Sequence, residues 1–152
     1  MKNKLKYFIK NIFQKDLNKW SIYNFKSNIK NIIFSKNLDL KKLKNVNLFK
    51  PPKHEFWADP FLFEYKKKKY IFFEKYLKKD NRGIISVGEL KNNHLINIKD
   101  ILVKNYHLSY PFIFKHNKKI YLVPESYQAK KLQIFESINF PTKWKLVKNL
   151  FQ

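Results

Sequence analysis

The stretch Asp59-Pro60-Phe61-Leu62-Phe63-Glu64-Tyr65 decides the fold of this 152-residue chain, because a similar stretch follows 51 positions later. Without any gap, Pro60-Phe61-Leu62-Phe63 corresponds to Pro111-Phe112-Ile113-Phe114. The first copy runs into a lysine turn from Lys66 to Lys69 and then into a second aromatic run, which is the form of a β-hairpin. The sequence therefore predicts antiparallel β-structure that occurs twice.

The repeat extends over four predicted strands in each copy. In the first copy the later strands are Tyr70 to Glu74, Gly83 to Leu90 and His94 to Val103. Four strands in about fifty residues are typical of a β-propeller blade. The second copy matches these strands at Tyr121-Leu122 and Glu125, then, after a four-residue deletion, at Leu132, Ile134 and Glu136, and finally at Trp144 and Leu146.

Two such units are too few for a closed propeller, which has about 4 to 8 blades. An open pair leaves unpaired strand edges and an uncovered apolar face. We therefore expect either a truncated copy of a longer protein, or a half-propeller that missing blades from a neighbouring chain or domain complete.

Four segments are expected along the chain. Residues 1–19 form a basic amphipathic helix, residues 20–52 a first strand and linker, residues 53–104 the first blade-like repeat, and residues 105–152 the second. Lysines interrupt the apolar run of the helix, so it is not a secretory signal, and a cytoplasmic location is expected. The helix either docks on the domain that follows or lies on an anionic membrane surface, which would make the protein peripheral to the membrane.

Composition excludes several classes of protein. The 44% of hydrophobic residues predict a packed core, the absence of cysteine excludes disulfides and thiolate sites, and no apolar run approaches the roughly 18 residues of a membrane span. The net charge of +22 suggests nucleic-acid binding. However, Arg82 is the sole arginine, and the lysines are spread along the chain, so we predict no specific nucleic-acid partner. A basic module that binds nucleic acid or anionic membrane is the alternative.

Several ordered motifs carry a family resemblance that covers roughly residues 20 to 151. Together they resemble the N-terminal domain of the glucosamine inositolphosphorylceramide transferase family. The resemblance implies a mainly β fold, part of a five-bladed propeller similar to the levansucrase, invertase and arabinanase glycosidases. The motifs are Trp20-Ser21-Ile22, Phe56 to Phe63, Tyr70 to Glu74, His107 to Phe112, Val123 to Ser126 and Asn139 to Trp144.

The same resemblance implies a carbohydrate or glycolipid context. In the plant transferases the glycosyl transfer belongs to a separate C-terminal domain, to which nothing in this chain corresponds. The implied role is therefore a saccharide-binding module, or an accessory part of glycosyl transfer, in polysaccharide or glycolipid biosynthesis. Its expected partner is a saccharide or glycolipid.

Asp59 is the candidate catalytic residue, because it stands where the first-blade carboxylate of the similar glycosidases would be. The second-blade position is Tyr110, where those enzymes carry another aspartate. A phenol with a reference pKa of about 10 cannot replace an ionised carboxylate at neutral pH. We therefore do not expect hydrolysis by this chain alone, and a hydrolase or transferase that uses Asp59 is the alternative.

The candidate substrate-binding residues are Trp57, Glu74, His107, Tyr110 and Glu125. Carboxylates accept hydrogen bonds from sugar hydroxyl groups, and a tryptophan ring offers a stacking face. The alternative role is structural: Asp59 would cap a turn before Pro60, and the two glutamates would satisfy backbone donors. The four histidines have no metal-binding spacing and the chain has no glycine-rich phosphate loop, so we predict no metal and no cofactor.

Overall fold

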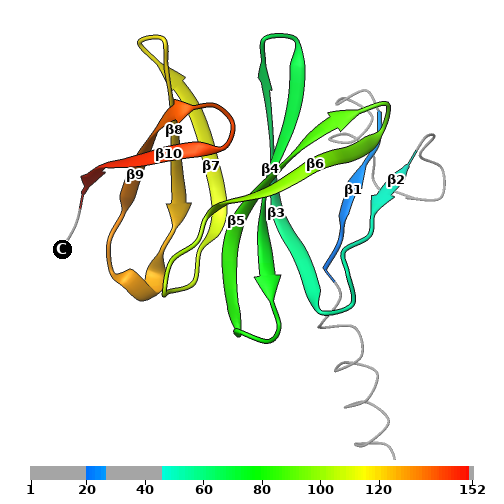
Figure 1. Cartoon of the computed structure of the whole chain (residues 1–152), viewed down its shortest axis with the longest axis horizontal. Coiled ribbons are helices and arrows are strands. Elements are labelled where there is room, and N and C mark those ends of the chain that lie inside the picture. The colour runs from blue at the N-terminus through cyan, green and yellow to red at the C-terminus, as the bar shows by residue number, and fades with distance from the viewer. Residues whose placement is uncertain (1–19, 27–45, 151–152) are drawn as a thin grey trace, which may run out of the picture.

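The computed structural model describes residues 20–26 and 46–150, and this part of the chain is mainly β (Figure 1). The helix predicted over residues 1–19 lies outside the described residues. Every strand pairing in the described part is antiparallel. The strands are β1 (Ile22–Asn24), β2 (Asn47–Phe49), β3 (Glu55–Tyr65), β4 (Lys68–Leu77), β5 (Arg82–Lys91), β6 (His94–Leu102), β7 (Ser109–His116), β8 (Lys119–Glu125), β9 (Gln133–Asn139) and β10 (Lys143–Asn149), with a short 3₁₀-helix at Tyr127–Ala129 between β8 and β9.

Two-residue turns join the strands of three hairpins. Both residues of each turn, at 66–67, 92–93 and 117–118, have positive φ. This is the conformation of a type I′ turn, whose twist matches that of the strands it connects. The turn expected over Lys66 to Lys69 is therefore shorter, because β4 already begins at Lys68.

Strands β3 to β10 form two four-stranded meanders, in the orders β3-β4-β5-β6 and β7-β8-β9-β10, and β1 and β2 form a separate two-stranded sheet. The first strands of the two sheets, β3 and β7, contact each other, so the sheets stand side by side (Figure 1). The main core lies between them. Its fully buried side chains include Phe72 and Ile85 from the first sheet, and Leu122 and Phe135 from the second.

A smaller core lies on the opposite face of the first sheet. There Ile22 of β1 and Phe49 of β2 pack against Trp57, Ile71 and Phe73. In Figure 1 the β1–β2 pair accordingly lies on the far side of the β3–β6 sheet from β7–β10. The first sheet is thus covered on both faces.

The two first strands share an irregularity at matching positions. Asp59 in β3 and Tyr110 in β7 both have positive φ, 49° and 45°, and both directly precede a proline. Each lies in a break of the strand register, between Ala58 and Phe61 and between Ser109 and Phe112. Such bulges bend a strand and redirect side chains, so they set the geometry of the candidate site.

Candidate functional site

Glu74 lies at the centre of the candidate site. It belongs to β4, pairs with Ala58 of β3, and is only 6% exposed. Its neighbour Phe73 packs in the smaller core, so by the alternation of a strand the Glu74 carboxyl group faces the second sheet. A carboxyl group thus lies buried at the junction of the two sheets.

Asp59 links the two sheets. The backbone N–H of Tyr110 donates a hydrogen bond of 3.3 Å to Asp59 Oδ2. The negative charge of Asp59 also acts on the nearby carboxyl group of Glu74. The bulge of β3 therefore places Asp59 between Glu74 and the backbone of β7.

His107 approaches Glu74 from the loop before β7, with Nε2 at 3.3 Å from Glu74 Oε1. The N–H of Gly83 donates to His107 Nδ1 at 3.0 Å, so a neutral ring carries its hydrogen on Nε2. Burial lowers the pKa of His107, and the carboxylates of Glu125 and Asp59 oppose this effect. The contact with Glu74 is accordingly a close polar contact of a neutral imidazole rather than an ion pair.

Burial also controls the charge of Glu74. Desolvation, followed by the negative charge of Asp59, the hydrogen bond with Asp59 and the charge of Glu125, raises the pKa of Glu74 from 4.5 to about 7. A fraction of Glu74 side chains therefore still carries a proton near pH 7. The cluster combines acceptor oxygens with a carboxylic acid that can donate.

Glu125 occupies in β8 the position that Glu74 occupies in β4. It pairs with Ser109, as Glu74 pairs with Ala58, and Ser109 Oγ donates to Glu125 Oε2 at 2.9 Å. Unlike Glu74, Glu125 is exposed. Solvent therefore reaches this end of the cluster.

Tyr110 is the aromatic residue of the cluster that solvent reaches most readily, with 61% of its surface exposed. A positive φ in a bulky residue other than glycine is strained, and aspartate tolerates this conformation better than tyrosine does. Such strain collects at binding and catalytic sites. The strained backbone of Tyr110 therefore lies against Asp59, at a cost in stability.

The sequence did not predict the part played by Gly83. A β-carbon at this position would lie 2.5 Å from the backbone oxygen of Leu108 and 2.6 Å from Glu74 Oε1. Gly83 also accepts a hydrogen bond from Leu108 N at 2.9 Å. The rarity of glycine was the feature of the sequence that could have indicated this position, since the chain has only two glycines.

Ser109 and Gln128 were likewise absent from the predicted site. Ser109 differs from Ala58, its counterpart 51 positions earlier, and this difference could have indicated a hydroxyl group at the site. The Gln128 side chain accepts a hydrogen bond from His107 N at 2.9 Å. Nothing in the sequence around Gln128 indicated this contact across the loop.

The structure does not bring Trp57 to the cluster. Trp57 is 7% exposed and packs beside Phe73 on the other face of the first sheet, so its ring has no free face for a sugar. Its indole N–H donates to Glu55 Oε2 at 3.0 Å. The stacking role expected for Trp57 is therefore replaced by a role in the core.

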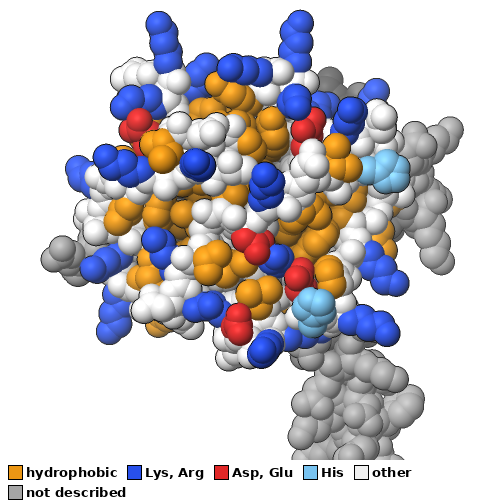
Figure 2. All heavy atoms as spheres, in the orientation of Figure 1, with side chains coloured by type: hydrophobic (Ala, Val, Ile, Leu, Met, Phe, Trp, Pro, Cys, Tyr) orange, Lys and Arg blue, Asp and Glu red, His pale blue; other side chains and the backbone are white. Residues whose placement is uncertain are grey.

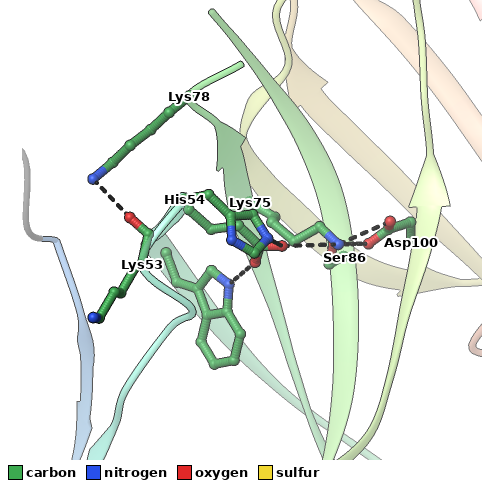
Figure 3. A network of polar contacts seen from close by, with 8 residues as sticks. Lys53, His54, Lys75, Lys78, Ser86 and Asp100 are labelled. Atoms are coloured by element: carbon green, nitrogen blue, oxygen red, sulfur yellow. Dashed lines mark hydrogen bonds and ion pairs between the residues drawn. The ribbon is translucent and has the colours of Figure 1, made fainter. Parts of the chain in front are cut away.

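Trp57 belongs instead to a polar network, shown in Figure 3. Lys75 lies 2.6 Å from Asp100 Oδ1 and 3.9 Å from Glu55 Oε1, and Ser86 Oγ donates to Asp100 Oδ1 at 2.7 Å. Lys75 thus forms ion pairs with both Asp100 and Glu55, while Lys78 donates to the backbone oxygen of Lys53. We assign the network a structural role.

Among residues 20–26 and 46–150, no group of three histidine or acidic side chains has the arrangement to hold a metal ion. No helix in the described part of the chain is long and apolar enough to cross a bilayer.

Comparison with known proteins gives the family. The family model described as glucosamine inositolphosphorylceramide transferase 1, N-terminal, matches residues 44–152. The chain belongs to this family. Glucosamine inositolphosphorylceramide transferase 1 of Arabidopsis thaliana is 36% identical over 95 residues, and the protein of the same name from Oryza sativa subsp. indica is 34% identical over 99 residues.

The matches to these transferases cover 61% and 62% of this chain but only 12% and 13% of the relatives' own length. The chain thus corresponds to a small part of each curated relative. All the residues of the site lie within the region that the family model matches. No solved structure shows significant similarity to the chain.

Proposed function

We propose that this domain binds a saccharide at the cluster of Asp59, Glu74, His107, Tyr110 and Glu125, as an accessory module in glycolipid biosynthesis. The observation that carries the proposal is the convergence of three carboxyl groups at one junction of two sheets, where the backbone N–H of Tyr110 binds Asp59 and the Tyr110 side chain is exposed. Such groups match the hydroxyl groups of a sugar, which both donate and accept hydrogen bonds.

The names of the relatives suggest which saccharides to test. They refer to glucosamine and to inositolphosphorylceramide, which is a glycolipid context. We infer that the ligand of this domain contains a sugar or an inositol ring.

We further propose that the two sheets are neighbouring blades of a propeller-like domain. Support comes from the contact between β3 and β7, the first strand of each four-stranded meander, and from the bulges at matching positions in both strands. In a propeller the first strands line the central axis. The cluster would then lie at the mouth of that axis.

Isothermal titration with glucosamine, myo-inositol and related saccharides tests the binding proposal. We expect binding to the wild-type chain, and at least a tenfold loss in Asp59→Asn and in Tyr110→Ala. Asp100→Asn is the matched control, because Asp100 belongs to the polar network on the other face of the first sheet. Equal affinity in Asp59→Asn and the wild type would contradict the proposal, as would the absence of binding by a folded chain.

A catalytic role for Asp59 is the second candidate, and the protonated Glu74 beside it favours this reading, since a general acid must hold its proton near neutral pH. However, a general acid must also reach the glycosidic oxygen of its substrate. Glu74 is only 6% exposed, and His107 Nε2 lies 3.3 Å from its Oε1. This burial favours binding over hydrolysis by the pair.

Turnover by the longer protein tests the catalytic candidate. If Asp59→Asn in the longer protein leaves turnover unchanged while the protein stays folded, the candidate is wrong. A loss of kcat with unchanged KM supports it, because such a loss marks an interaction made in the transition state.

The positive net charge does not favour another function over saccharide binding. Figure 2 shows lysine side chains spread over the visible face, with apolar side chains between them. Non-specific attraction to anionic surfaces remains the expected consequence of this distribution. Peripheral membrane contact through residues 1–19 stays a prediction.

A further inference from the structure

One face of the first sheet is buried by the second sheet, and it is rich in aromatic residues. Phe61, Phe63, Tyr70, Phe72 and Val87 all contribute to this face, and Phe72 is completely buried. The second sheet meets this face with the buried side chains of Ile113, Leu122 and Phe135. The aromatic face of the first sheet thus packs against a mixed aliphatic and aromatic surface, to which Phe140 and Trp144 also contribute.

The second sheet carries a corresponding aromatic face. Positions 51 residues later hold Phe112, Phe114, Tyr121 and Val123. Phe112 pairs with Val123 and Phe114 pairs with Tyr121, so these four side chains share one face, opposite to that of Leu122. The rings of Phe114 and Tyr121 stack at 5.3 Å. The face that receives a neighbour in the first sheet therefore recurs in the second.

The described part of the chain covers this second face only at one edge, where Phe61 of β3 meets the ring of Phe112 with their centroids 5.5 Å apart. Phe112 is 45% exposed, and Phe114, Tyr121 and Val123 are only half-buried. Phe72 of the first sheet, which corresponds to Val123, has no exposed surface. Contiguous exposed aromatic surface of this kind marks an interaction site.

We propose that the outer face of β7–β10, formed by Phe112, Phe114, Tyr121 and Val123, is a docking surface for a further four-stranded sheet of the same kind as residues 105–152. This surface repeats the interface between the two described sheets, because the corresponding residues of the first sheet form its buried face. The partner sheet presents the positions that correspond to Ile113, Leu122 and Phe135, which the second sheet buries against the first. Two sheets packed in this way remain about 10 Å apart and bury both faces.

The docking surface reaches the candidate site. Glu125 lies on the same face as Phe112, two residues beyond Val123 on β8, and it is exposed. In the first sheet, His107 and the loop before β7 cover the corresponding Glu74. A docked sheet would cover Glu125 from the same direction and so enclose the open end of the cluster.

The absence of cysteine from the chain allows a direct test with single cysteines. Phe112→Cys is labelled with a maleimide in the full chain, and in the full chain extended after Gln152 by a second copy of residues 105–152. We expect the labelling rate at position 112 to fall at least tenfold in the extended chain. Tyr23→Cys is the matched control, because Tyr23 is exposed on β1, beyond the other face of the first sheet, and its rate should not change.

A second variant separates docking from general effects of the extension. Tyr121→Lys places a charge on the docking surface at a half-buried position, and it should restore rapid labelling at position 112 in the extended chain. Equal labelling in the short and extended chains would overturn the proposal, as would an added unit that stays unfolded by circular dichroism. Protection that appears in the short chain as its concentration rises would also overturn it, because a second copy would then be the occupant. No saccharide enters this test, so its failure leaves the proposed binding function untouched.

Discussion

Replacing Glu74 by glutamine tests the electrostatics of the cluster. Glutamine has nearly the same shape as a protonated glutamic acid, but it does not ionise. Burial and the neighbouring carboxylates raise the pKa of Glu74 from 4.5 to about 7 in the folded chain. At about 1.4 kcal/mol per pKa unit, this difference corresponds to a stability change on the order of 3 kcal/mol.

The direction follows from proton binding by the two states. Below pH 4.5 the Glu74 carboxyl group is neutral in both states, and the stability that its retained proton confers is fully present. As pH rises from 4.5 to about 7, the unfolded chain releases this proton while the folded chain keeps it, so the free energy of unfolding decreases. Above about pH 7 both states are ionised and the loss levels off.

Urea denaturation monitored by circular dichroism at several pH values measures this effect. At pH 5 we expect Glu74→Gln to be within about 1 kcal/mol of the wild type, and at pH 8.5 to exceed it by about 3 kcal/mol. Glu64→Gln is the control, because Glu64 is exposed on β3 and its replacement should change little at either pH. A constant difference between Glu74→Gln and the wild type across this range would refute the reasoning.

Three further substitutions test the surroundings of Glu74. Gly83→Ala should reduce the free energy of unfolding by about 1–3 kcal/mol, because its β-carbon would lie 2.5 Å from the backbone oxygen of Leu108. Gly88→Ala should reduce it less, because the close neighbour there is the side chain of Leu95, which can move. Tyr110→Asn should stabilise the chain by about 1 kcal/mol in thermal or urea denaturation, because asparagine tolerates a positive φ. The same substitution should weaken saccharide binding. An unchanged or lower stability would contradict the strain assigned to Tyr110. Burial lowers the pKa of His107 below 6.5, so the contribution of His107 to stability should fall as pH decreases through this range, in opposition to the gain from Glu74. The stability of His107→Gln relative to the wild type should therefore rise as pH decreases, and parallel pH curves for the two proteins would count against it.

The sequence predicted the antiparallel sheets because aromatic and β-branched runs with polar turns are local signals. Its offset of 51 positions also paired Glu74 with Glu125 and Asp59 with Tyr110, and the structure brings these residues together at one junction. The family assignment was correct as well.

The role of Trp57 was mispredicted for a physical reason. Trp57 and Asp59 are two residues apart in β3, so regular alternation would place both side chains on one face. The bulge at Asp59 interrupts this alternation, and β1–β2 covers the face that Trp57 occupies. Gly83 was missed because its importance depends on a close approach by Leu108 and Glu74, which lie far from it in the sequence or on another strand. Tertiary contacts of this kind leave no periodic signal.

Nuclear magnetic resonance of the chain with ¹⁵N-labelled tyrosine tests the central claim most directly, because the Tyr110 amide donates its hydrogen bond to Asp59 within the cluster. During a titration with glucosamine or myo-inositol, the account predicts a saturable shift of the Tyr110 amide signal, which Asp59→Asn abolishes, while the signal of Tyr23 on β1 stays in place. Saccharide binding that shifts other signals and leaves Tyr110 unmoved would contradict the account.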